Sequence, residues 1–227
     1  MLNPDAIFFK IIISLIAIEG NSNPMSEIQF KIALAILLLV DVGIRLYYQR
    51  GRKEFEKAVV KHELREKFFN ALVSLGFISI FLYVLTSWID PFQIPLHGLL
   101  RWLGAVTIFA GDLLFIWSHR ALGKNWSPFL EIRKEQTLVT DGPYHFIRHP
   151  MYAAIFLIGI GTSLLSANWI AVLAYLLPVT IMYLVRVSDE EQMMIEQFGN
   201  EYREYMRRTG RLMPKLSNSG HCCPMKR

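Results

Sequence analysis

The chain has 227 residues, of which 53% are hydrophobic and 19% charged, and its mean hydropathy is +0.32. This composition is too apolar for an ordinary soluble surface, and it excludes a disordered chain or a nucleic-acid-binding module. The net charge of +5 fits basic loops at one face of a membrane better than polyanion binding. The two cysteines, Cys222 and Cys223, are adjacent, which excludes a disulfide framework and a four-cysteine metal site.

Long apolar segments predict an all-α, polytopic integral membrane protein with five to six transmembrane helices. The segment 6–18 is apolar but short, and we expect it to be a sixth, short or tilted, membrane helix. Residues 1–27 then form an N-terminal hydrophobic extension, 28–121 transmembrane helices, 122–214 the functional core and 215–227 a disordered tail. The five longer segments are 28–48, 68–89, 99–117, 151–167 and 169–185.

The distribution of Lys and Arg predicts the orientation of these helices. Segments 45–67 and 119–148, and everything after Arg186, are rich in basic residues and should face the cytoplasm. The connections at 19–27, 90–97 and 166–168 are poor in Lys and Arg, so we expect them on the other side. This alternation gives a consistent six-span chain with both ends inside.

The last two apolar segments are separated by residues 166–168 alone, which predicts a tight helical hairpin. Gly159 and Gly161 should permit close packing of its first arm. After Val187 the sequence becomes amphipathic, because apolar residues recur every three or four positions from Ile195 to Tyr205. We therefore expect a separate amphipathic helix that packs on the cytoplasmic mouth of the bundle.

A long polar stretch between the third apolar segment and the hairpin is the first candidate site. Gly142 and Pro143 predict a turn, and Pro150 suits the first turn of the following helix. Amide groups at such a helix start favour an anionic group, and Arg148 and His149 stand beside them. The competing interpretation is that these residues, with Tyr152, only anchor the helix at the membrane interface.

The second candidate is the cluster Arg186, Asp189, Glu190 and Glu191, where the hairpin returns to the same face. Acidic residues are common in the first turn of any helix, and basic residues are expected at a cytoplasmic helix end, so the cluster has a purely structural interpretation. The hairpin, however, should bring it next to the turn around His149. Opposite charges would then line one pocket at the membrane surface.

Asp41 and Asp112 lie inside apolar segments, where a carboxylate is costly. Both are therefore functional candidates without an assigned partner.

Four motifs together resemble the isoprenylcysteine carboxyl methyltransferase family. They are the run from Leu138 to Tyr144, the run from Arg148 to Tyr152, the pair Glu190–Glu191, and the run from Phe198 to Tyr202. The resemblance spans roughly residues 122–214. It implies an all-helical membrane enzyme that transfers a methyl group from S-adenosylmethionine to the carboxylate of a prenylcysteine-like or other lipophilic acceptor entering from the bilayer.

The resemblance also implies a set of site residues. Arg186 matches the arginine associated with the substrate carboxylate, and Gln136 stands where family members often have a histidine. No metal and no nucleic acid is implied, and the cytoplasmic loop and C-terminal amphipathic helix would form the cofactor site. The residues that resemble the cofactor site are Gln136, Thr137, Leu138, Val139, Tyr144, His149, Pro150, Met151, Tyr152 and Glu190.

This reaction needs no catalytic triad, because a carboxylate is already ionised near neutral pH and can attack a methyl sulfonium without a general base. Arg186 would orient the carboxylate and Glu190 would meet the cofactor's ammonium group. The alternative enzyme is a phospholipid or amine N-methyltransferase, which would need a base such as Glu191 or His149. A non-enzymatic membrane scaffold is the alternative from a different class.

Overall fold

The computed structural model describes residues 24–50, 63–123 and 137–215. Every regular element in these ranges is helical, so the predicted all-α class is confirmed for them. The segment 6–18, expected as a sixth membrane helix, and the tail beyond residue 215 lie outside the described residues. The helices are α2 (Pro24–Arg50), α3 (Glu63–Leu85), α4 (Gly98–Leu122), α5 (Pro150–Ser166), α6 (Trp169–Phe198) and α7 (Asn200–Arg208), with short 3₁₀ turns η1 (Asp90–Phe92) and η3 (Gly142–His145).

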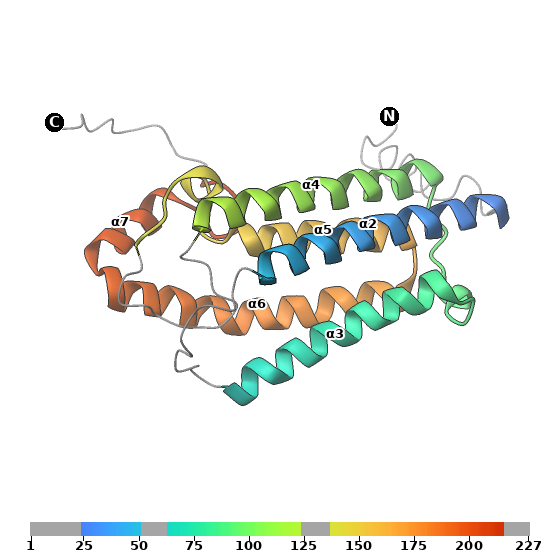
Figure 1. Cartoon of the computed structure of the whole chain (residues 1–227), viewed down its shortest axis with the longest axis horizontal. Helices are drawn as coiled ribbons and strands as arrows, with labels where there is room; N and C mark the ends of the chain where they lie inside the picture. Colours follow the sequence, from blue (N-terminus) through green and yellow to red (C-terminus); the bar gives the residue numbers. More distant parts are fainter. Residues whose placement is uncertain (1–23, 51–62, 124–136, 216–227) are drawn as a thin grey trace, which may run out of the picture.

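The long helices run along the long axis of the molecule, and Figure 1 shows α7 and η3 together at one end of it. We call this the site end. At the opposite end, the turn end, the α3–α4 connection lies beside the turn between α5 and α6. The segments that are rich in Lys and Arg adjoin helix termini at the site end, as the charge distribution predicted.

Hydrogen bonds hold the turn end together. The Ile94 amide donates to the Ala167 carbonyl at 2.6 Å, and the Asn168 side-chain amide donates to the Ile89 carbonyl at 2.6 Å. Asn168 also caps α6, because its side-chain oxygen accepts from the amides of the first turn of that helix. Ala167, with φ 47°, is the left-handed residue that ends α5. The predicted tight hairpin turn is therefore confirmed.

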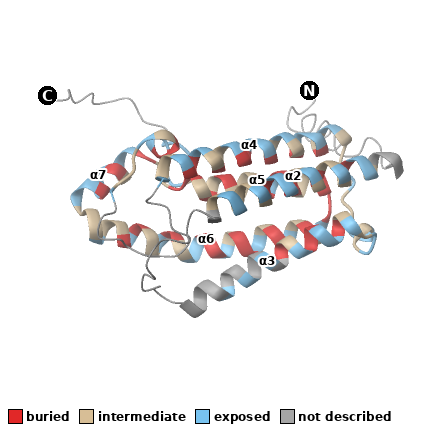
Figure 2. Ribbon diagram, in the orientation of Figure 1, coloured by how far each residue is buried: buried red, intermediate tan, exposed pale blue. Residues whose placement is uncertain are grey.

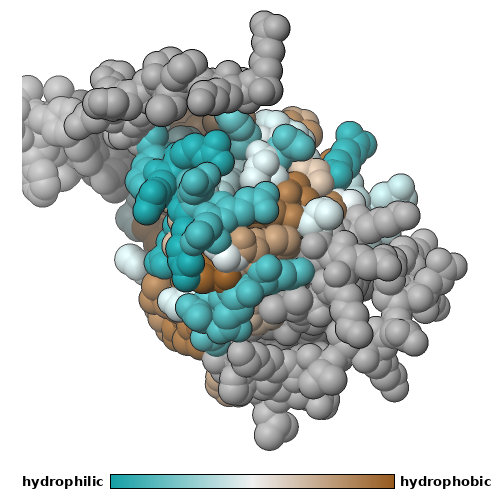
Figure 3. Space-filling view, turned by 90° about the vertical axis from the view of Figure 1, so that its left-hand side faces the viewer, coloured by the Kyte–Doolittle hydropathy of each residue, from teal (hydrophilic) through white to brown (hydrophobic). Residues whose placement is uncertain are grey.

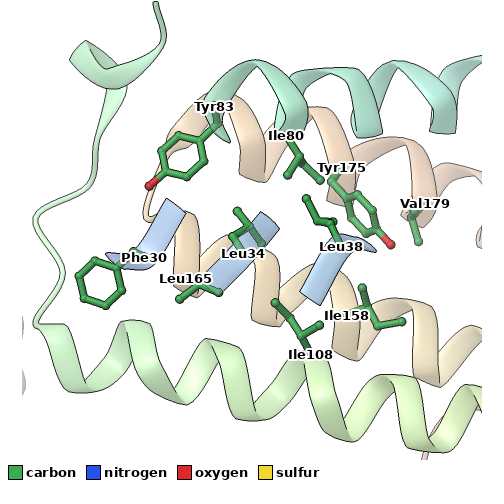
Figure 4. Close-up of a cluster of buried hydrophobic side chains, with 10 residues drawn as sticks. All are labelled: Phe30, Leu34, Leu38, Ile80, Tyr83, Ile108, Ile158, Leu165, Tyr175 and Val179. Atoms are coloured by element: carbon green, nitrogen blue, oxygen red, sulfur yellow. The ribbon is translucent and has the colours of Figure 1, made fainter. Parts of the chain in front are cut away.

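A single apolar core joins all five long helices, as Figure 4 shows. Residues spaced three and four apart on each helix point into it, the pattern of an amphipathic helix with one packed face. Edge-to-face contact between Phe77 of α3 and Tyr175 of α6, with ring centroids 5.6 Å apart, adds a specific link between those helices. The buried members are Phe30, Leu34, Leu38, Ile80, Tyr83, Ile108, Ile158, Leu165, Tyr175 and Val179.

Glycines let α4 and α5 approach very closely. A Cβ atom added at Gly104 would lie 2.6 Å from the Gly161 carbonyl oxygen, and one at Gly161 would lie 2.6 Å from the Gly104 oxygen. Gly159 similarly faces the ring of Tyr175 on α6. Small residues at helix contacts are how membrane helices gain packing without a hydrophobic driving force. The predicted packing role of Gly159 and Gly161 is confirmed.

The outward faces of the bundle carry large apolar side chains, shown as exposed in Figure 2. On α4 alone these include Leu99, Leu103, Val106, Phe109 and Leu113. Apolar surface this continuous marks an interaction surface such as a bilayer. Among the described residues, α4 and α6 are long and apolar enough to cross a membrane, and α5 is a shorter apolar helix. The number of five to six spans stays a prediction.

The separate amphipathic helix expected after Val187 is wrong in its boundaries. Helix α6 continues without interruption from the apolar hairpin arm to Phe198, and it ends at Gly199, whose φ of +56° is a left-handed conformation. Only then does the short helix α7 begin. Acidic residues are compatible with a helix interior, so the change of composition near Glu190 does not break the backbone. Glu190 therefore lies deep inside α6 and not at a helix start.

Candidate functional site

The site begins with the sharp entry of the chain into α5. Gly142 adopts φ +61° ahead of the η3 turn, and His149 occupies the N-cap position of α5. Pro150 takes the first helical position, where its missing N–H costs nothing. The predicted turn at Gly142–Pro143 and the placement of Pro150 in the first turn are thus confirmed.

The hairpin brings this helix start against the far end of the membrane-crossing part of α6. The Tyr152 hydroxyl donates to Glu190 Oε1 at 2.6 Å. His149 Nδ1 lies 3.6 Å from Glu190 Oε2, and Arg186 Nε lies 3.6 Å from Glu190 Oε1. Four predicted site residues from two distant segments therefore meet at one carboxylate, whose side chain remains 23% exposed.

Glu191, the neighbouring residue, has a different environment. It accepts from Arg148 Nε at 2.9 Å and from Arg211 Nη2 at 2.6 Å, and His149 Nε2 lies 3.4 Å away. Burial alone would raise the pKa of this carboxyl, but the neighbouring His149 and the hydrogen bonds from Arg211 and Arg148 outweigh it and hold the pKa well below its usual range. Glu191 is therefore a permanently ionised anchor and too weak a base to remove a proton from an amine.

The segment after α7 folds back onto the start of α5. The Arg148 amide donates to the Gly210 carbonyl at 2.8 Å, and the His149 amide donates to the Arg211 carbonyl at 3.0 Å. Arg148 also donates through Nη1 to the Thr209 carbonyl. These two amides, which lie just before the first helical residue Pro150, are therefore occupied by the chain itself. The first-turn amides that the sequence suggested for an anionic ligand begin at Met151, and their role stays a prediction.

Helix α7 is fixed to η3 by a buried tyrosine. The Tyr205 hydroxyl donates to the Tyr144 carbonyl at 2.6 Å, and burial raises the pKa of Tyr205 to about 12, which keeps it a neutral donor. Burial likewise raises the pKa of Tyr144. The apolar spacing that predicted an amphipathic segment up to Tyr205 thus serves to close the site end over the start of α5.

The structure joins some predicted residues directly and leaves others beside the cluster. His149, Tyr152 and Arg186 each contact Glu190, and Pro150 and Met151 adjoin His149 and Tyr152 in the first turn of α5. Tyr144 is buried in η3, and the extended residues Thr137, Leu138 and Val139 lead into that turn. Gln136 lies outside the described residues.

Sequence reasoning missed Arg211 entirely and misjudged Glu191. Arg211 lies beyond the last helix, where no periodicity marks it, yet it forms the shortest bond to Glu191. Glu191 was considered as a base, whereas the structure gives it a clamping role. The signal that the sequence offered was the pairing of opposite charges in the two motifs. Arg148 pairs with Glu191, while the next residue, His149, lies beside Glu190.

Viewed from the site end, the described part of the molecule presents a group of hydrophilic residues with hydrophobic surface beside them, as Figure 3 shows. This juxtaposition suits a polar reactant and an apolar one that approach from different sides.

Comparison with known proteins places this cluster in a family context. The sequence model of the isoprenylcysteine carboxyl methyltransferase (ICMT) family matches residues 102–196, which include His149, Tyr152, Arg186 and Glu190. The chain is 29% identical over 114 residues to protein-S-isoprenylcysteine O-methyltransferase B of Arabidopsis thaliana, covering 49% of this chain and 58% of that one. It is 32% identical over 120 residues to the Homo sapiens protein-S-isoprenylcysteine O-methyltransferase, covering 51% and 42%.

The fold agrees with a solved relative. The structure of the eukaryotic intramembrane Ras methyltransferase ICMT matches with a TM-score of 0.58 at 21% identity, covering 93% of this chain and 75% of that chain. The chain spans 58% of the Arabidopsis relative and 42% of the human one, so the correspondence concerns the part that holds the site. The resemblance found in the motifs is confirmed: residues 102–196, from α4 to the far part of α6, carry the pattern of the ICMT family.

Proposed function

We propose that the protein is an integral membrane, S-adenosylmethionine-dependent methyltransferase that esterifies the carboxylate of a prenylcysteine-like or other lipophilic acceptor. The observation that carries this proposal is the meeting of Glu190 with Arg186, His149 and Tyr152 at one end of an apolar bundle. The relatives are named as methyltransferases of this kind, and the family match covers all four residues.

The residues present fit S-adenosylmethionine, which supplies an electrophilic methyl group when bound. Glu190 is partly exposed, and the nearest nitrogens of Arg186 and His149 stand at 3.6 Å, which leaves its carboxylate able to accept an ammonium group. Buried His149 Nε2 forms no hydrogen bond within the described part of the chain. We assign cofactor contacts to Glu190 and His149, together with the residues of the same motifs: Gln136, Thr137, Leu138, Val139, Tyr144, Pro150, Met151 and Tyr152.

Arg186 is the residue that we assign to the acceptor carboxylate. Its side chain is 11% exposed and lies one helical turn from Glu190, so a carboxylate held by the guanidinium would stand beside the cofactor contacts. The group is already ionised at neutral pH, so the protein has only to orient it and exclude water. Apolar helix faces next to the cluster suit the acceptor's lipophilic part.

The N-methyltransferase alternative loses one of its two bases. Because Arg148, Arg211 and His149 hold Glu191 ionised with a low pKa, it cannot take a proton from an ammonium group near neutral pH. Only His149 remains for that role. The structure therefore favours an acceptor that needs no deprotonation.

Cofactor binding by purified protein in detergent tests the assignment of Glu190. Glu190→Gln keeps the shape of the side chain but removes its charge. The binding free energy of S-adenosylmethionine should therefore weaken by about 1.5–3 kcal/mol, the range for a charge-assisted hydrogen bond. Glu196→Gln, on the exposed side of the same helix, is the matched control and should bind normally. Equal affinity of the two variants would reject the site.

The product distinguishes the acceptor classes. A carboxyl methyl ester made from labelled cofactor and lipid extract releases volatile methanol in mild base, whereas an N-methyl product does not. Base-stable label would replace the carboxyl acceptor with an amine.

The cytoplasmic orientation of the site is part of the proposal, supported by basic residues at the site end. In a background without Cys222 and Cys223, single cysteines at exposed Ser87 and Glu204 should react with an impermeant reagent from opposite sides of the membrane. Glu204 should react only from the cytoplasmic side. Labelling of both from one side would overturn the topology.

A further inference from the structure

A second polar cluster lies inside the apolar bundle and takes no part in the proposed reaction. Asp41 of α2 is completely buried, and Asp112 of α4 is 3% exposed. Both belong to helices that we treat as membrane-crossing, where ionised side chains are costly. Arg45, one turn from Asp41, completes the cluster on α2, and Tyr175 of α6 lies near enough to interact with it electrostatically.

Arg45 pairs with only one of the two carboxyl groups. Its Nε donates to both oxygens of Asp41, at 3.0 and 2.8 Å. The guanidinium also lies against two aromatic rings, 4.9 Å from the ring centre of Phe115 and 5.6 Å from that of Phe77, while its side chain is 23% exposed. Asp41 and Arg45 thus neutralise each other's charge beside these two rings.

Asp112 is left in an unusual position. Within the described residues neither of its carboxyl oxygens accepts a hydrogen bond, although the side chain is almost fully buried. The group that it faces within hydrogen-bonding reach is the carboxyl of Asp41, itself an acceptor, and Arg45 lies near enough to interact electrostatically. Two acceptors that face each other repel unless a proton stands between them.

The described neighbours of this part of α4 on α5 and α3 are apolar. Gly111 beside it packs against Ile158 and Ala154 of α5, which are apolar, and α3 contributes Phe77 to the cluster. With both carboxylates ionised the cluster would carry one net negative charge in a dry interior, at a cost of several kcal/mol. Within the described part of the chain, Arg45 is the one cation that we find acting on Asp112, and it already pairs with Asp41.

We propose that Asp112 is a neutral carboxylic acid at neutral pH and donates a hydrogen bond to Asp41. A single proton removes the net charge and turns one of the two orphaned Asp112 oxygens into a donor, as in other carboxyl pairs that share a site. It also creates a polar link between α2 and α4 inside the membrane. A metal ion fits less well, because the Arg45 guanidinium stands in the cluster and the described residues hold no group of three or more metal-ligating side chains.

Infrared difference spectroscopy of the full chain in detergent tests this proton directly. Wild-type protein at neutral pH should show the carbonyl stretching band of a protonated carboxylic acid, shifted in D₂O, and Asp112→Asn should lack it. Asp41→Asn should also lack it, because Asp112 would then ionise to pair with Arg45. An identical acid region in wild type and Asp112→Asn would overturn the proposal.

Two further measurements keep the test decisive. Asp112→Asn retains a side-chain donor for Asp41, so it should stay folded and keep methyl-transfer activity within about twofold, whereas Asp112→Leu should be markedly less stable. If Asp112→Asn does not fold, ¹³C-aspartate-labelled wild type still decides, because exposed aspartates are ionised at neutral pH. Absence of the acid band, with a melting temperature that rises in sodium relative to choline salts, would replace the proton by a cation and overturn the proposal.

Discussion

The two ends of the bundle each hold an ionic cluster, but the two clusters are built differently. At the turn end, Arg101 donates to both oxygens of Glu27, at 2.6 and 3.0 Å, and to the Leu165 carbonyl at 3.0 Å. Tyr83 donates to the same carboxylate at 2.5 Å. The Arg101 side chain is 6% exposed. The hydrogen bonds of this cluster all run between neighbouring helices and connect α2, α3, α4 and α5.

At the site end, Glu190 has one short hydrogen bond, from Tyr152, and the nitrogens of Arg186 and His149 stand at 3.6 Å. Its side chain is also more exposed than that of Glu27, at 23% against 14%. The compact bidentate pairing of Glu27 is typical of a structural lock. The longer contacts around the partly exposed carboxylate of Glu190 leave that group able to bind a ligand. Glu191, next to Glu190, is paired with arginines through short bonds, as Glu27 is at the turn end. The site end therefore contains one tightly paired carboxylate and one that is partly open.

The largest expected effect is on the turn-end lock. Arg101→Leu removes one partner of a buried pair and leaves the Glu27 carboxylate uncompensated, so the free energy of unfolding should fall by about 3–5 kcal/mol. The double change Glu27→Leu with Arg101→Leu removes both charges and should recover most of that loss. Thermal unfolding in detergent measures both. Cofactor affinity of the folded double variant should equal that of wild type, and a loss of binding there would join the two ends functionally.

Glu191 should show its clamping role through pH. The pKa of this carboxyl is lowered in the folded protein, so its contribution to stability is complete above the unfolded value of about 4.3 and disappears as pH falls toward the folded value. Glu191→Gln should therefore cost roughly 3 kcal/mol at neutral pH, and the gap to wild type should narrow below about pH 4. Chemical denaturation across pH measures the gap. A constant gap would mean that the charge of Glu191 contributes nothing.

Arg186 should affect turnover more than binding. Arg186→Leu removes the charge-assisted hydrogen bond that would orient the acceptor. The activation free energy should therefore rise by about 1.5–3 kcal/mol, which lowers kcat roughly 10- to 150-fold. Arg186→Lys should retain part of the activity but lose bidentate geometry. Exposed Arg208→Leu on α7 is the control and should remain active. An Arg186→Leu enzyme with normal kcat and an altered cofactor affinity would move Arg186 from the acceptor to the cofactor.

The sequence predicted the parts of the fold that depend on local composition. Apolar length predicted the long helices, the short turn at residues 166–168 predicted the hairpin, and basic segments predicted which helix ends lie together. The boundary after Val187 was wrong because polarity changes there while helix propensity does not, and only Gly199 stops the helix. Composition reports the surroundings of a helix better than its ends.

The site was predictable as far as motifs reach. The hairpin argument correctly paired the turn at His149 with Glu190, because connectivity alone brings them together. Roles within the cluster were not predictable, since Glu190 and Glu191 are adjacent and chemically identical. What separates them is Arg211, which arrives from beyond α7 through backbone hydrogen bonds to Arg148 and His149 that no local pattern encodes.

The smallest expected effects come from two tyrosines that make the same bond at opposite ends. Tyr83 donates to Glu27 at 2.5 Å and Tyr152 donates to Glu190 at 2.6 Å, so each change to Phe removes one hydroxyl from one carboxylate. Tyr83→Phe should lower the free energy of unfolding by about 1–2 kcal/mol and leave cofactor binding unchanged, because its carboxylate serves the fold.

Tyr152→Phe should do the reverse. Glu190 keeps its charge but loses the donor that orients it, so cofactor affinity should weaken by about 0.5–1.5 kcal/mol, with a smaller change in stability than Tyr83→Phe produces. Calorimetric binding and thermal unfolding of both variants measure the two affinities and the two stabilities. Tyr83→Phe should show the larger loss of stability, and Tyr152→Phe the larger loss of affinity. If Tyr152→Phe destabilises the protein as much as Tyr83→Phe and leaves affinity untouched, Glu190 is a second structural lock, and the difference drawn between the two ends disappears.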